Sequence, residues 1–296
     1  MIPIRYVEPV FRPPSEAESL ILPVTDGCSW NECTFCEMYT APQKKFRARD
    51  ESEVLESIRL TGERYGDQVR RIFLADGDAT VLPTRRLLAI LEAIRSHLPA
   101  VRRVSSYCLP RNLRKKSQQE IDELAAAGLS MVYVGAESGD DEVLAAVNKG
   151  ETFETTREAL DKLGAAGITR SVMILNGLGG KVHSRQHADN SARLANATQP
   201  EYLATLVVSF PMGEQRFRAG FPEWEPLSQH ELFVETEQLL SALELKRTVF
   251  RSDHASNYLV LKGTLGADKA RLLAQVRQAI EAPEQAHLRP AWARGL

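Results

Sequence analysis

The chain has 296 residues, of which 43% are hydrophobic and 26% are charged, and its formal net charge is -2. These values indicate a globular protein with a sizeable core and exclude both a disordered chain and a protein that is basic overall, as many nucleic-acid-binding proteins are. No apolar run approaches the roughly 18 residues of a membrane span, and the first residues lack the apolar core of a signal peptide, so we expect a cytoplasmic protein without a membrane segment.

The predicted elements alternate between short β-branched runs and longer segments with helical periodicity. Candidate strands lie at residues 19–25, 70–75, 101–107, 130–135, 169–176 and 201–209. Candidate helices lie at residues 51–65, 84–97, 116–127, 140–148, 153–166, 184–196 and 229–243. Apolar strands separated by helices favour a parallel sheet covered on both faces, either doubly wound or closed toward a barrel.

The pattern changes after about residue 245, where two short candidate strands and a final helix follow. These elements lie at residues 248–251, 258–262 and near 267–280. We therefore predict an N-terminal arm at residues 1–17, an α/β domain at 18–245 and a small C-terminal extension at 246–296.

Two clusters of cations stand out along the chain. They are Lys44, Lys45, Arg47 and Arg49, and then Arg111, Arg114, Lys115 and Lys116. Runs of like charge are usually solvated faces, so we predict exposure, with phosphate contact as the alternative.

Three of the four cysteines, Cys28, Cys33 and Cys36, directly follow the first candidate strand, whereas Cys108 lies far downstream. Clustered thiols in a chain without a signal peptide indicate a metal site rather than a disulfide framework. The loop sits at the carboxyl end of a strand, where parallel α/β folds place their sites. Three thiolates could hold a four-iron cluster with one iron left open.

Two other metal sites remain as alternatives. A structural zinc site would need a fourth ligand, which the loop does not show. Plant-type ferredoxins share the C-x4-C-x2-C spacing, and Cys108 could supply their distant fourth ligand. The large strand-helix scaffold argues against a small electron carrier. For Cys108 itself, burial as a small apolar residue is the simpler interpretation.

The cysteine loop resembles the cluster motif of the radical S-adenosylmethionine (radical SAM) superfamily, which is usually C-x3-C-x2-C. This chain has one additional residue between Cys28 and Cys33. The run from Glu137 to Gly150 is similar to the branch that contains coproporphyrinogen oxidases and methylthiotransferases. The resemblance covers roughly residues 19–213 and implies a partial (β/α)6 TIM-like barrel with mostly parallel strands.

The same resemblance implies which residues contact S-adenosylmethionine. Phe35 and the backbone near Met38 would touch the adenine, and the acidic glycine turn after the second strand would hold the amino group. The complete set of predicted cofactor contacts is Phe35, Met38, Asp76, Gly77, Asp78, Ser105, Glu137, Ser138, Ile174 and Gly177. Core packing is the alternative for Phe35 and Met38, and an Asx turn is the alternative for the acidic glycine turn.

The resemblance also implies the activity. A reduced 4Fe-4S cluster would cleave S-adenosylmethionine to methionine and a 5′-deoxyadenosyl radical that abstracts hydrogen from the substrate. Without a further cysteine cluster, the chain departs from methylthiotransferases and from peptide-modifying enzymes with auxiliary clusters. We therefore expect a small-molecule substrate, with a peptide or tRNA as alternatives, and a low-potential electron donor such as flavodoxin or ferredoxin.

Overall fold

The computed structural model describes residues 3–294 and divides the chain into two compact units. Unit 1 runs to Asn31 and includes Met38–Val134 and Asp161–Arg170, while unit 2 contains Glu32–Glu37, Gly135–Leu160 and the residues from Ser171 onward. The division crosses the cysteine loop, so Cys28 belongs to unit 1 and the other two loop cysteines belong to unit 2.

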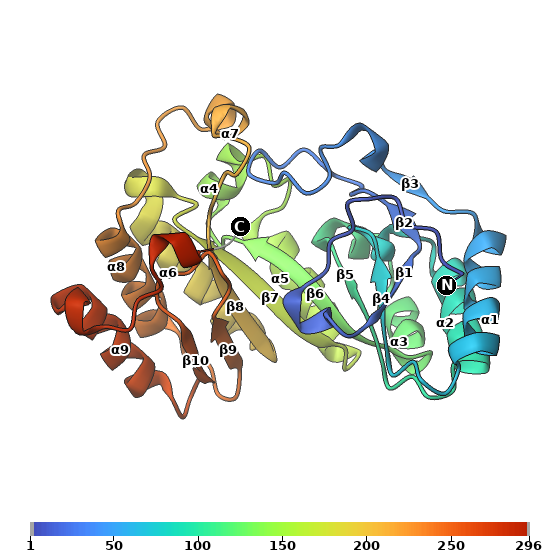
Figure 1. The fold of residues 1–296 in the computed structure, drawn as a ribbon. Coiled ribbons are helices and arrows are strands. Elements are labelled where there is room, and N and C mark those ends of the chain that lie inside the picture. The colour runs from blue at the N-terminus through green and yellow to red at the C-terminus, as the bar shows by residue number, and fades with distance from the viewer. Residues whose placement is uncertain (1–2, 295–296) are drawn as a thin grey trace. The chain divides into compact units, whose positions relative to one another are not determined.

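The strands form an 8-stranded sheet in the order β1-β4-β5-β6-β7-β8-β9-β10 (Figure 1). Their bounds are β1 Leu20–Pro23, β4 Arg71–Ala75, β5 Arg103–Tyr107, β6 Leu129–Glu137, β7 Thr169–Asn176, β8 Tyr202–Val207, β9 Val249–Ser252 and β10 Leu261–Thr264. The pairs β1/β4, β4/β5, β5/β6, β7/β8 and β8/β9 are parallel, and β10 pairs antiparallel with β9. The predicted α/β class with mostly parallel strands is confirmed, and the strand-helix repeats agree with a partial (β/α)6 barrel.

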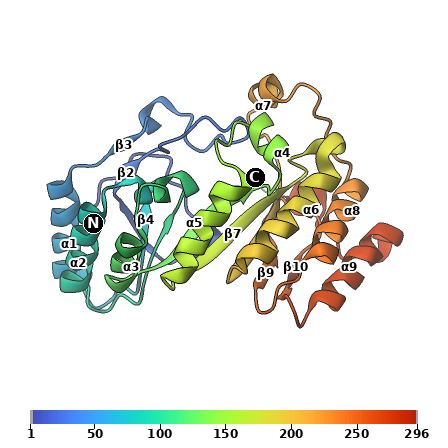
Figure 2. The same cartoon turned by 180° about the vertical axis from the view of Figure 1, so that it is seen from behind.

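Strand β4 of unit 1 is buried on both faces, as its apolar run predicts. Ile72 and Leu74 project to one face of β4 and Phe73 to the other, and all three are at most 1% exposed. The ring of Phe73 packs edge-on against Tyr107 and Tyr133. The helices α1 (Glu51–Tyr65), α2 (Thr84–His97) and α3 (Gln118–Ala126) belong to this unit; α3 lies in front of the strands in Figure 2, and α1 and α2 lie side by side at the outer edge.

A short antiparallel ribbon in unit 1 flanks the cysteine loop, with one strand before the loop and one after it. It consists of β2 (Thr25–Asp26) and β3 (Arg47–Ala48), with Asp26 opposite Arg47. The chain therefore returns, after the loop, to the point where the loop begins. Asp50 then starts α1, because its carboxylate accepts hydrogen bonds from the backbone N–H groups of Ser52 and Glu53.

Unit 2 contains the remaining strands and most of the remaining helices. The helices are α4 Asp141–Ala146, α5 Phe153–Ala165, α6 Gly180–Thr198, α7 Gln215–Gly220, α8 Gln229–Ala242 and α9 Lys269–Glu281, and the last residues of α5 belong to unit 1. A buried apolar cluster joins α4, α7 and the loops beside them. Its members are Val143, Val147, Leu178, Phe217, Phe221 and Trp224.

Most predicted elements are present near their predicted bounds. Helices α1 and α2 have the predicted ends, whereas the first predicted strand, 19–25, is divided into β1 and β2. Strand β3 and helix α7 were not predicted, because two and six residues are too few to establish a periodicity. The C-terminal segment adds β9, β10 and α9, and the three-part domain division stays a prediction. None of the helices within residues 3–294 combines the length and the apolar character needed to cross a bilayer.

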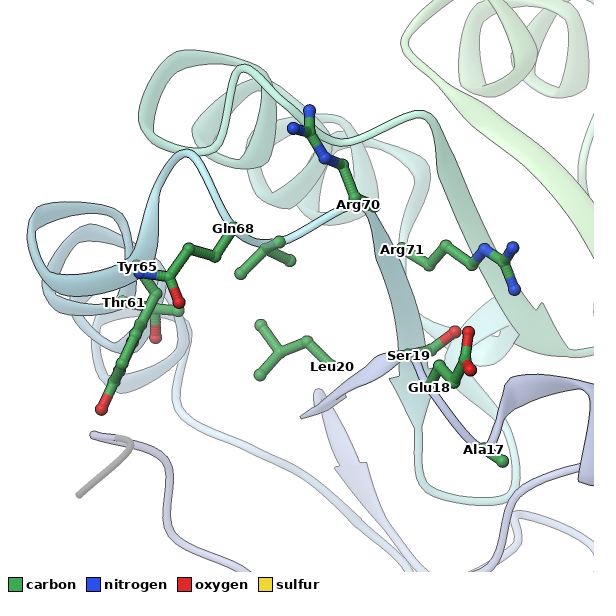
Figure 3. A pocket seen from close by; sticks show the side chains of 10 residues that line it. Ala17, Glu18, Ser19, Leu20, Thr61, Tyr65, Gln68, Arg70 and Arg71 are labelled. Atoms are coloured by element: carbon green, nitrogen blue, oxygen red, sulfur yellow. The ribbon is translucent and has the colours of Figure 1, made fainter.

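A hollow of unit 1 lies away from the cysteine loop. One cavity of about 500 Å³ lies at the amino ends of β1 and β4 (Figure 3). It is lined by residues 17–20, Thr61, Tyr65 and residues 68–71. The cysteine loop instead leaves the carboxyl end of β1, the edge where parallel sheets place their sites.

Candidate functional site

The cysteine loop starts directly after β2 in unit 1. Cys28 is half-buried, Cys33 is buried and Cys36 is half-buried, and all are present as thiols rather than disulfides. In unit 2, the backbone N–H of Cys36 donates to the carbonyl of Cys33 at 3.3 Å, which makes a tight turn. The position of the loop after the first strand agrees with the sequence analysis.

In unit 1, Asp76 fastens the entry to this loop. Its Oδ2 accepts hydrogen bonds from the backbone N–H of Gly27 at 3.3 Å and from Lys44 Nζ at 2.5 Å. The side chains of Lys44 and Asp76 are only 1% and 3% exposed. Burial raises the pKa of Asp76, and the Lys44 ammonium opposes that rise. Oδ1 of Asp76 is buried and has no hydrogen-bond partner among the described residues.

The residue before Cys28 must be a glycine because its backbone lies close to that of Lys44. Gly27 has a φ of +69°, and a Cβ atom there would lie 2.0 Å from the carbonyl oxygen of Lys44. A side chain at this position would therefore separate the loop entry from Lys44.

Asp78 binds the cysteine loop at Ser29, the residue after Cys28. The Ser29 hydroxyl donates to Oδ2 of Asp78, and the side-chain amide of Asn112 donates to Oδ1. Burial raises the pKa of Asp78 to about 6, against the opposing effect of these hydrogen bonds. Arg111, beside Asn112, lies 3.6 Å from the ring centroid of Trp30 in the loop. The carboxylate predicted to contact the cofactor is thus engaged in holding the cysteine loop.

Gly77, between the two aspartates, lies under the ring of Tyr39. A Cβ atom at Gly77 would come within 2.6 Å of Cε2 of Tyr39. The glycine therefore permits the close approach of ring and backbone at the end of β4, close to the loop entry.

In unit 2, Glu137 ends β6 in the left-handed backbone region, with a φ of +65°. Its Oε1 lies 3.3 Å from Nζ of Lys149, and both side chains are buried. Oε2 of Glu137 is also buried and has no hydrogen-bond partner in the described part of the chain. Burial lowers the pKa of Lys149, but the negative charges of Glu137, Cys33 and Cys36 outweigh burial and raise it.

Lys149 thus joins the predicted residues of unit 2. Its ammonium group lies 5.8 Å from the ring centroid of Phe35. Phe35 packs against the apolar cluster of this unit, so both proposed roles of Phe35, core packing and ligand contact, remain compatible with its position. The sequence analysis missed Lys149 as a site residue, and a lysine directly before Gly150 in the resembling run was the available signal.

Ser138 points toward helix α6. Its Oγ lies 2.7 Å from Nδ1 of His187 and accepts a hydrogen bond from the backbone N–H of Asp140 at 3.0 Å. Asp140 caps α4 by accepting from the backbone N–H of Val143, as its sequence position predicts. The Ser138 hydroxyl is therefore used within the protein.

Gly177, after β7, is held through both of its backbone polar groups. Its N–H donates to Oε1 of Glu235 at 2.6 Å, and its carbonyl accepts from Nε1 of Trp224 at 3.2 Å. Ser184 donates to the other oxygen of Glu235 at 2.6 Å. A cavity of about 200 Å³ lies at this turn and is lined by Gly177, residues 207–210, Glu214, Trp224, Pro226, Leu227 and Leu232.

Three predicted cofactor contacts remain: Ile174 and Ser105 are buried in the sheet, and Met38 is half-buried. Ile174 is buried and projects to the same face of β7 as Asn176, whose amide donates to Thr236 of α8. Ser105 is buried beside Phe73 in the sheet of unit 1. Met38 is half-buried. The assignment of all these residues to a cofactor stays a prediction.

The expected exposure of the basic clusters is wrong for two lysines. Lys44 is buried against Asp76, and Lys116 is buried with Nζ donating to the carbonyl of Leu82 at 2.7 Å. Each ammonium group has found a specific oxygen partner, which a count of charges along the sequence does not reveal.

The residues present fit an iron–sulfur cluster and an amino-acid-bearing ligand. Thiolates are the usual protein ligands of such clusters, and the buried, unpartnered oxygens of Asp76 and Glu137 are suited to accept hydrogen bonds from a ligand. Within residues 3–294, no set of three or more His, Cys, Asp or Glu side chains surrounds a single position that could hold a metal ion. A four-iron cluster places each thiolate on a different iron, so its ligands need not surround one point.

Comparisons with known proteins give a consistent family. The family model described as "Radical SAM superfamily" matches residues 22–195. No curated protein matches the chain. Among solved structures, coproporphyrinogen III oxidase (HemN) from Escherichia coli, a radical SAM enzyme, is similar with a TM-score of 0.56 and 16% identity, over 75% of this chain and 52% of that chain.

Two further structures show the same fold. Methylornithine synthase (PylB) has a TM-score of 0.54 and 14% identity, over 92% of this chain and 74% of its own. The radical S-adenosylmethionine methyltransferase TsrM from Kitasatospora setae, with cobalamin and a [4Fe-4S] cluster bound, has a TM-score of 0.52 and 20% identity, over 63% of this chain. The chain spans only 36% of the length of TsrM.

Proposed function

Because the chain belongs to the radical SAM superfamily, we propose that it is an enzyme in which Cys28, Cys33 and Cys36 bind a 4Fe-4S cluster. The cysteine loop after the first parallel strand carries this proposal. Its three thiols leave one iron of the cluster without a protein ligand, and S-adenosylmethionine would bind there. These two cofactors are the ones that the superfamily uses.

When bound and reduced, this pair of cofactors supplies a 5′-deoxyadenosyl radical, with methionine as the other product, for removal of a hydrogen atom from the substrate. The residues of the chain bind and orient the pair. Lys149 places a buried positive charge near Cys33 and Cys36, the two proposed cluster ligands of unit 2. The unpartnered oxygens of Asp76 and Glu137 would accept hydrogen bonds from the ammonium or hydroxyl groups of S-adenosylmethionine.

The other predicted cofactor contacts fall into two groups, residues that would contact S-adenosylmethionine and residues that would support the site. Gly77 allows close backbone approach, and Gly177 is presented rigidly by Glu235 and Trp224. Phe35 and Met38 would contact the adenine from the cysteine loop. Asp78, Ser105, Ser138 and Ile174 are engaged within the protein, so we propose that they support the site rather than bind S-adenosylmethionine through free side-chain atoms.

We also propose a cytoplasmic enzyme acting on a small molecule, with a peptide or tRNA as the other substrate classes to be tested. Thiols that must stay reduced and bind iron favour a reducing compartment. A low-potential protein, flavodoxin or ferredoxin, would supply the electron.

Anaerobic reconstitution with iron and sulfide, followed by dithionite and S-adenosylmethionine, tests the proposed function. The expected result is formation of 5′-deoxyadenosine, its loss in Cys33→Ala and its retention in Cys108→Ala. Cys108 is a matched control because it is buried like Cys33, and its Sγ lies 3.7 Å from the carbonyl of Leu109. A two-iron spectrum that depends on Cys108 would instead indicate an electron carrier, and bound zinc without acid-labile sulfide would indicate a zinc module.

A further inference from the structure

The sheet of unit 2 has one face that helices cover. The amide of Asn176 in β7 donates to Thr236 of α8, and a Cβ atom at Gly263 of β10 would lie 3.0 Å from Nη2 of Arg271 in α9. The strand register places residues of the same face in one row across β7, β8, β9 and β10: Val172, Leu203, Phe250 and Gly263. The first three of these residues are at most 1% exposed. Helices α8 and α9 therefore cover this face.

The opposite face of the same four strands is not buried. Successive side chains of a strand project to opposite faces, and paired residues of neighbouring strands project to the same face. The next row therefore lies on the other face and consists of Met173, Ala204, Arg251 and Lys262. Leu175 and Leu206 lie on this face too, two residues closer to the carboxyl ends of β7 and β8. All six residues are half-buried or exposed, and we call their face the open face. Figure 1 shows the four strands side by side.

Arg251 brings a positive charge to the open face that no carboxylate neutralises. Its side chain is exposed, its Nη1 donates to the carbonyl of Phe250 at 3.0 Å, and it makes no ion pair within residues 3–294. Its cross-strand neighbour Lys262 is instead paired with Asp253 at 2.9 Å. The other four residues of the open face are apolar. Because a guanidinium presents several N–H groups in a planar fork, Arg251 is suited to bind a carboxylate or a phosphate.

Two arginines near the end of the chain add positive charge beside the carboxyl end of β9. Arg289 donates to the carbonyl of His254 at 2.6 Å, and Arg294 donates to a carbonyl two residues further on at 2.9 Å. Neither arginine has a carboxylate partner in the part of the chain that the structure describes. Burial and the charge of Arg289 lower the pKa of His254. The region that follows Arg251 is thus locally positive on a chain whose formal net charge is -2.

We propose that the open face binds the substrate of the radical reaction, with Arg251 binding a carboxylate or phosphate group of that substrate. The proposal rests on the proposed function and names a substrate class for it. Strands β7, β8 and β9 are parallel, and their carboxyl ends form the edge where such folds place their sites. The half-buried apolar residues of the open face would contact the rest of the molecule. The substrate is therefore a small molecule that carries an acidic group on an apolar body.

Three variants test the role of Arg251. Arg251→Gln removes the charge, and it should fold because the side chain is exposed and its hydrogen bond is to the preceding residue. Arg251→Lys keeps the charge but loses the planar fork. The matched control is Arg247→Gln, which removes an exposed arginine two residues before Val249, at the amino end of the same strand.

Binding is measured on the full-length chain without reconstitution, so the result does not depend on a cluster. The chain has only five methionines, and labelling their methyl groups with carbon-13 makes Met173 a reporter for NMR. Met173 lies two strands from Arg251, about 10 Å away, and Met173→Leu assigns its signal. The probes are benzoate and phenyl phosphate, each with an acidic group on an apolar ring, and benzyl alcohol as the neutral ring. All titrations are made at one ionic strength.

We expect benzoate or phenyl phosphate to shift the Met173 signal with a Kd roughly tenfold lower than that of benzyl alcohol. Arg251→Gln should abolish this difference, Arg251→Lys should keep part of it, and Arg247→Gln should behave as the wild type. The probe that binds more tightly identifies the acidic group as a carboxylate or a phosphate. Equal affinities for the three probes, or equal anion binding by Arg251→Gln and the wild type, would overturn the proposal. A shift confined to other methionines would also overturn it, because the anion would then bind elsewhere.

A second measurement separates the substrate from the cofactor, since S-adenosylmethionine has a carboxylate of its own. In reconstituted protein with dithionite and no substrate, the KM for S-adenosylmethionine in 5′-deoxyadenosine formation should be within about twofold of the wild type in Arg251→Gln. A KM raised as much as the Kd of the acidic probe would assign Arg251 to the cofactor and overturn the proposal. A wild type that forms no 5′-deoxyadenosine would refute the proposed function and, with it, the substrate role of the open face. The titrations, which need no cluster, would decide separately whether Arg251 binds an acidic group.

Discussion

The carboxylate of Glu137 at the end of β6 and the ammonium group of Lys149 form a buried ion pair, with Oε1 and Nζ 3.3 Å apart. The pair lies in unit 2, where the negative charges of Cys33 and Cys36 also act on Lys149. Only one oxygen of Glu137 is used, and the other is buried and has no partner within the described residues. One carboxylate oxygen of Glu137 therefore makes a structural contact with Lys149, and the other is an unused hydrogen-bond acceptor near two cysteines.

Removing one member of this pair should destabilise the protein strongly. Lys149→Met leaves Glu137 as a buried, unpaired charge, so we expect a loss of about 3–5 kcal/mol in the free energy of unfolding of the apoprotein. Adding Glu137→Gln should recover most of the loss, because both charges are then absent. Urea unfolding of the single and double variants measures this, with Lys149→Arg as the charge-conserving control. Equal stability of Lys149→Met and the wild type would contradict it.

The carboxyl of Asp78 should make stability depend on pH. Its pKa is raised from 3.8 to about 6 by burial, so the folded state holds a proton that the unfolded state releases. Stability from this group is therefore present below about pH 4 and lost as the pH rises through about 6, by up to roughly 3 kcal/mol. Asp78→Asn should remove this slope, and the exposed Asp122→Asn should not. Urea unfolding of the apoprotein at several pH values between these limits provides the measurement, and an unchanged slope in Asp78→Asn would refute the assignment.

Local sequence patterns were sufficient for the elements that position the site. Helix α1 has its predicted ends because Asp50 caps it, and the apolar run of β4 is the buried strand that it predicts, whereas in β7 every second residue is buried. The location of the cysteine loop could be predicted for the same reason. The motif directly follows a predicted strand, so it must lie at the carboxyl end of that strand.

Partners brought together by the fold could not be predicted from the sequence. Lys149 reaches Glu137 only because α4 turns the chain back, and Glu235 reaches Gly177 across a separation of 58 residues. Periodicity predicts which face of an element is buried, but it does not predict which polar groups form hydrogen bonds or ion pairs with each other. The same limit explains why Lys44 and Lys116 were expected on a solvated face and are buried.

The turn at Gly177 should depend on Glu235. Glu235→Leu would leave the Gly177 N–H and the Ser184 hydroxyl without their acceptor, which costs about 1–3 kcal/mol for each buried group left unsatisfied. We expect a lower melting temperature and a raised KM for S-adenosylmethionine in 5′-deoxyadenosine formation. Glu235→Gln, which keeps an acceptor oxygen, should restore most of both. Glu237→Leu on the same helix removes an ion pair with Arg277 at the surface and is the matched control. A raised KM in the control as well would assign the effect to the helix rather than to the turn.

The contact between Gly77 and Tyr39 should be sensitive to a single methyl group. In Gly77→Ala the added Cβ would lie 2.6 Å from Cε2 and 2.8 Å from Cζ of Tyr39, so the ring or the turn must move. Overpacking of this kind costs about 1–3 kcal/mol, and a displaced turn would also move Asp76 and Asp78, which fasten the cysteine loop.

We expect Gly77→Ala to hold less iron after reconstitution and to bind S-adenosylmethionine about tenfold more weakly, a loss of about 1.4 kcal/mol. The companion substitution Tyr39→Leu should relieve the clash and restore iron content, because the ring atoms nearest to the new methyl group are then absent. Gly128→Ala is the control for loss of glycine alone, since a Cβ there meets no atom within 4 Å although φ is +115°. It should lower stability through backbone strain and leave both iron content and cofactor affinity unchanged. Should Gly77→Ala and Gly128→Ala affect iron content equally, the close approach of Tyr39 would have no special role in shaping the site.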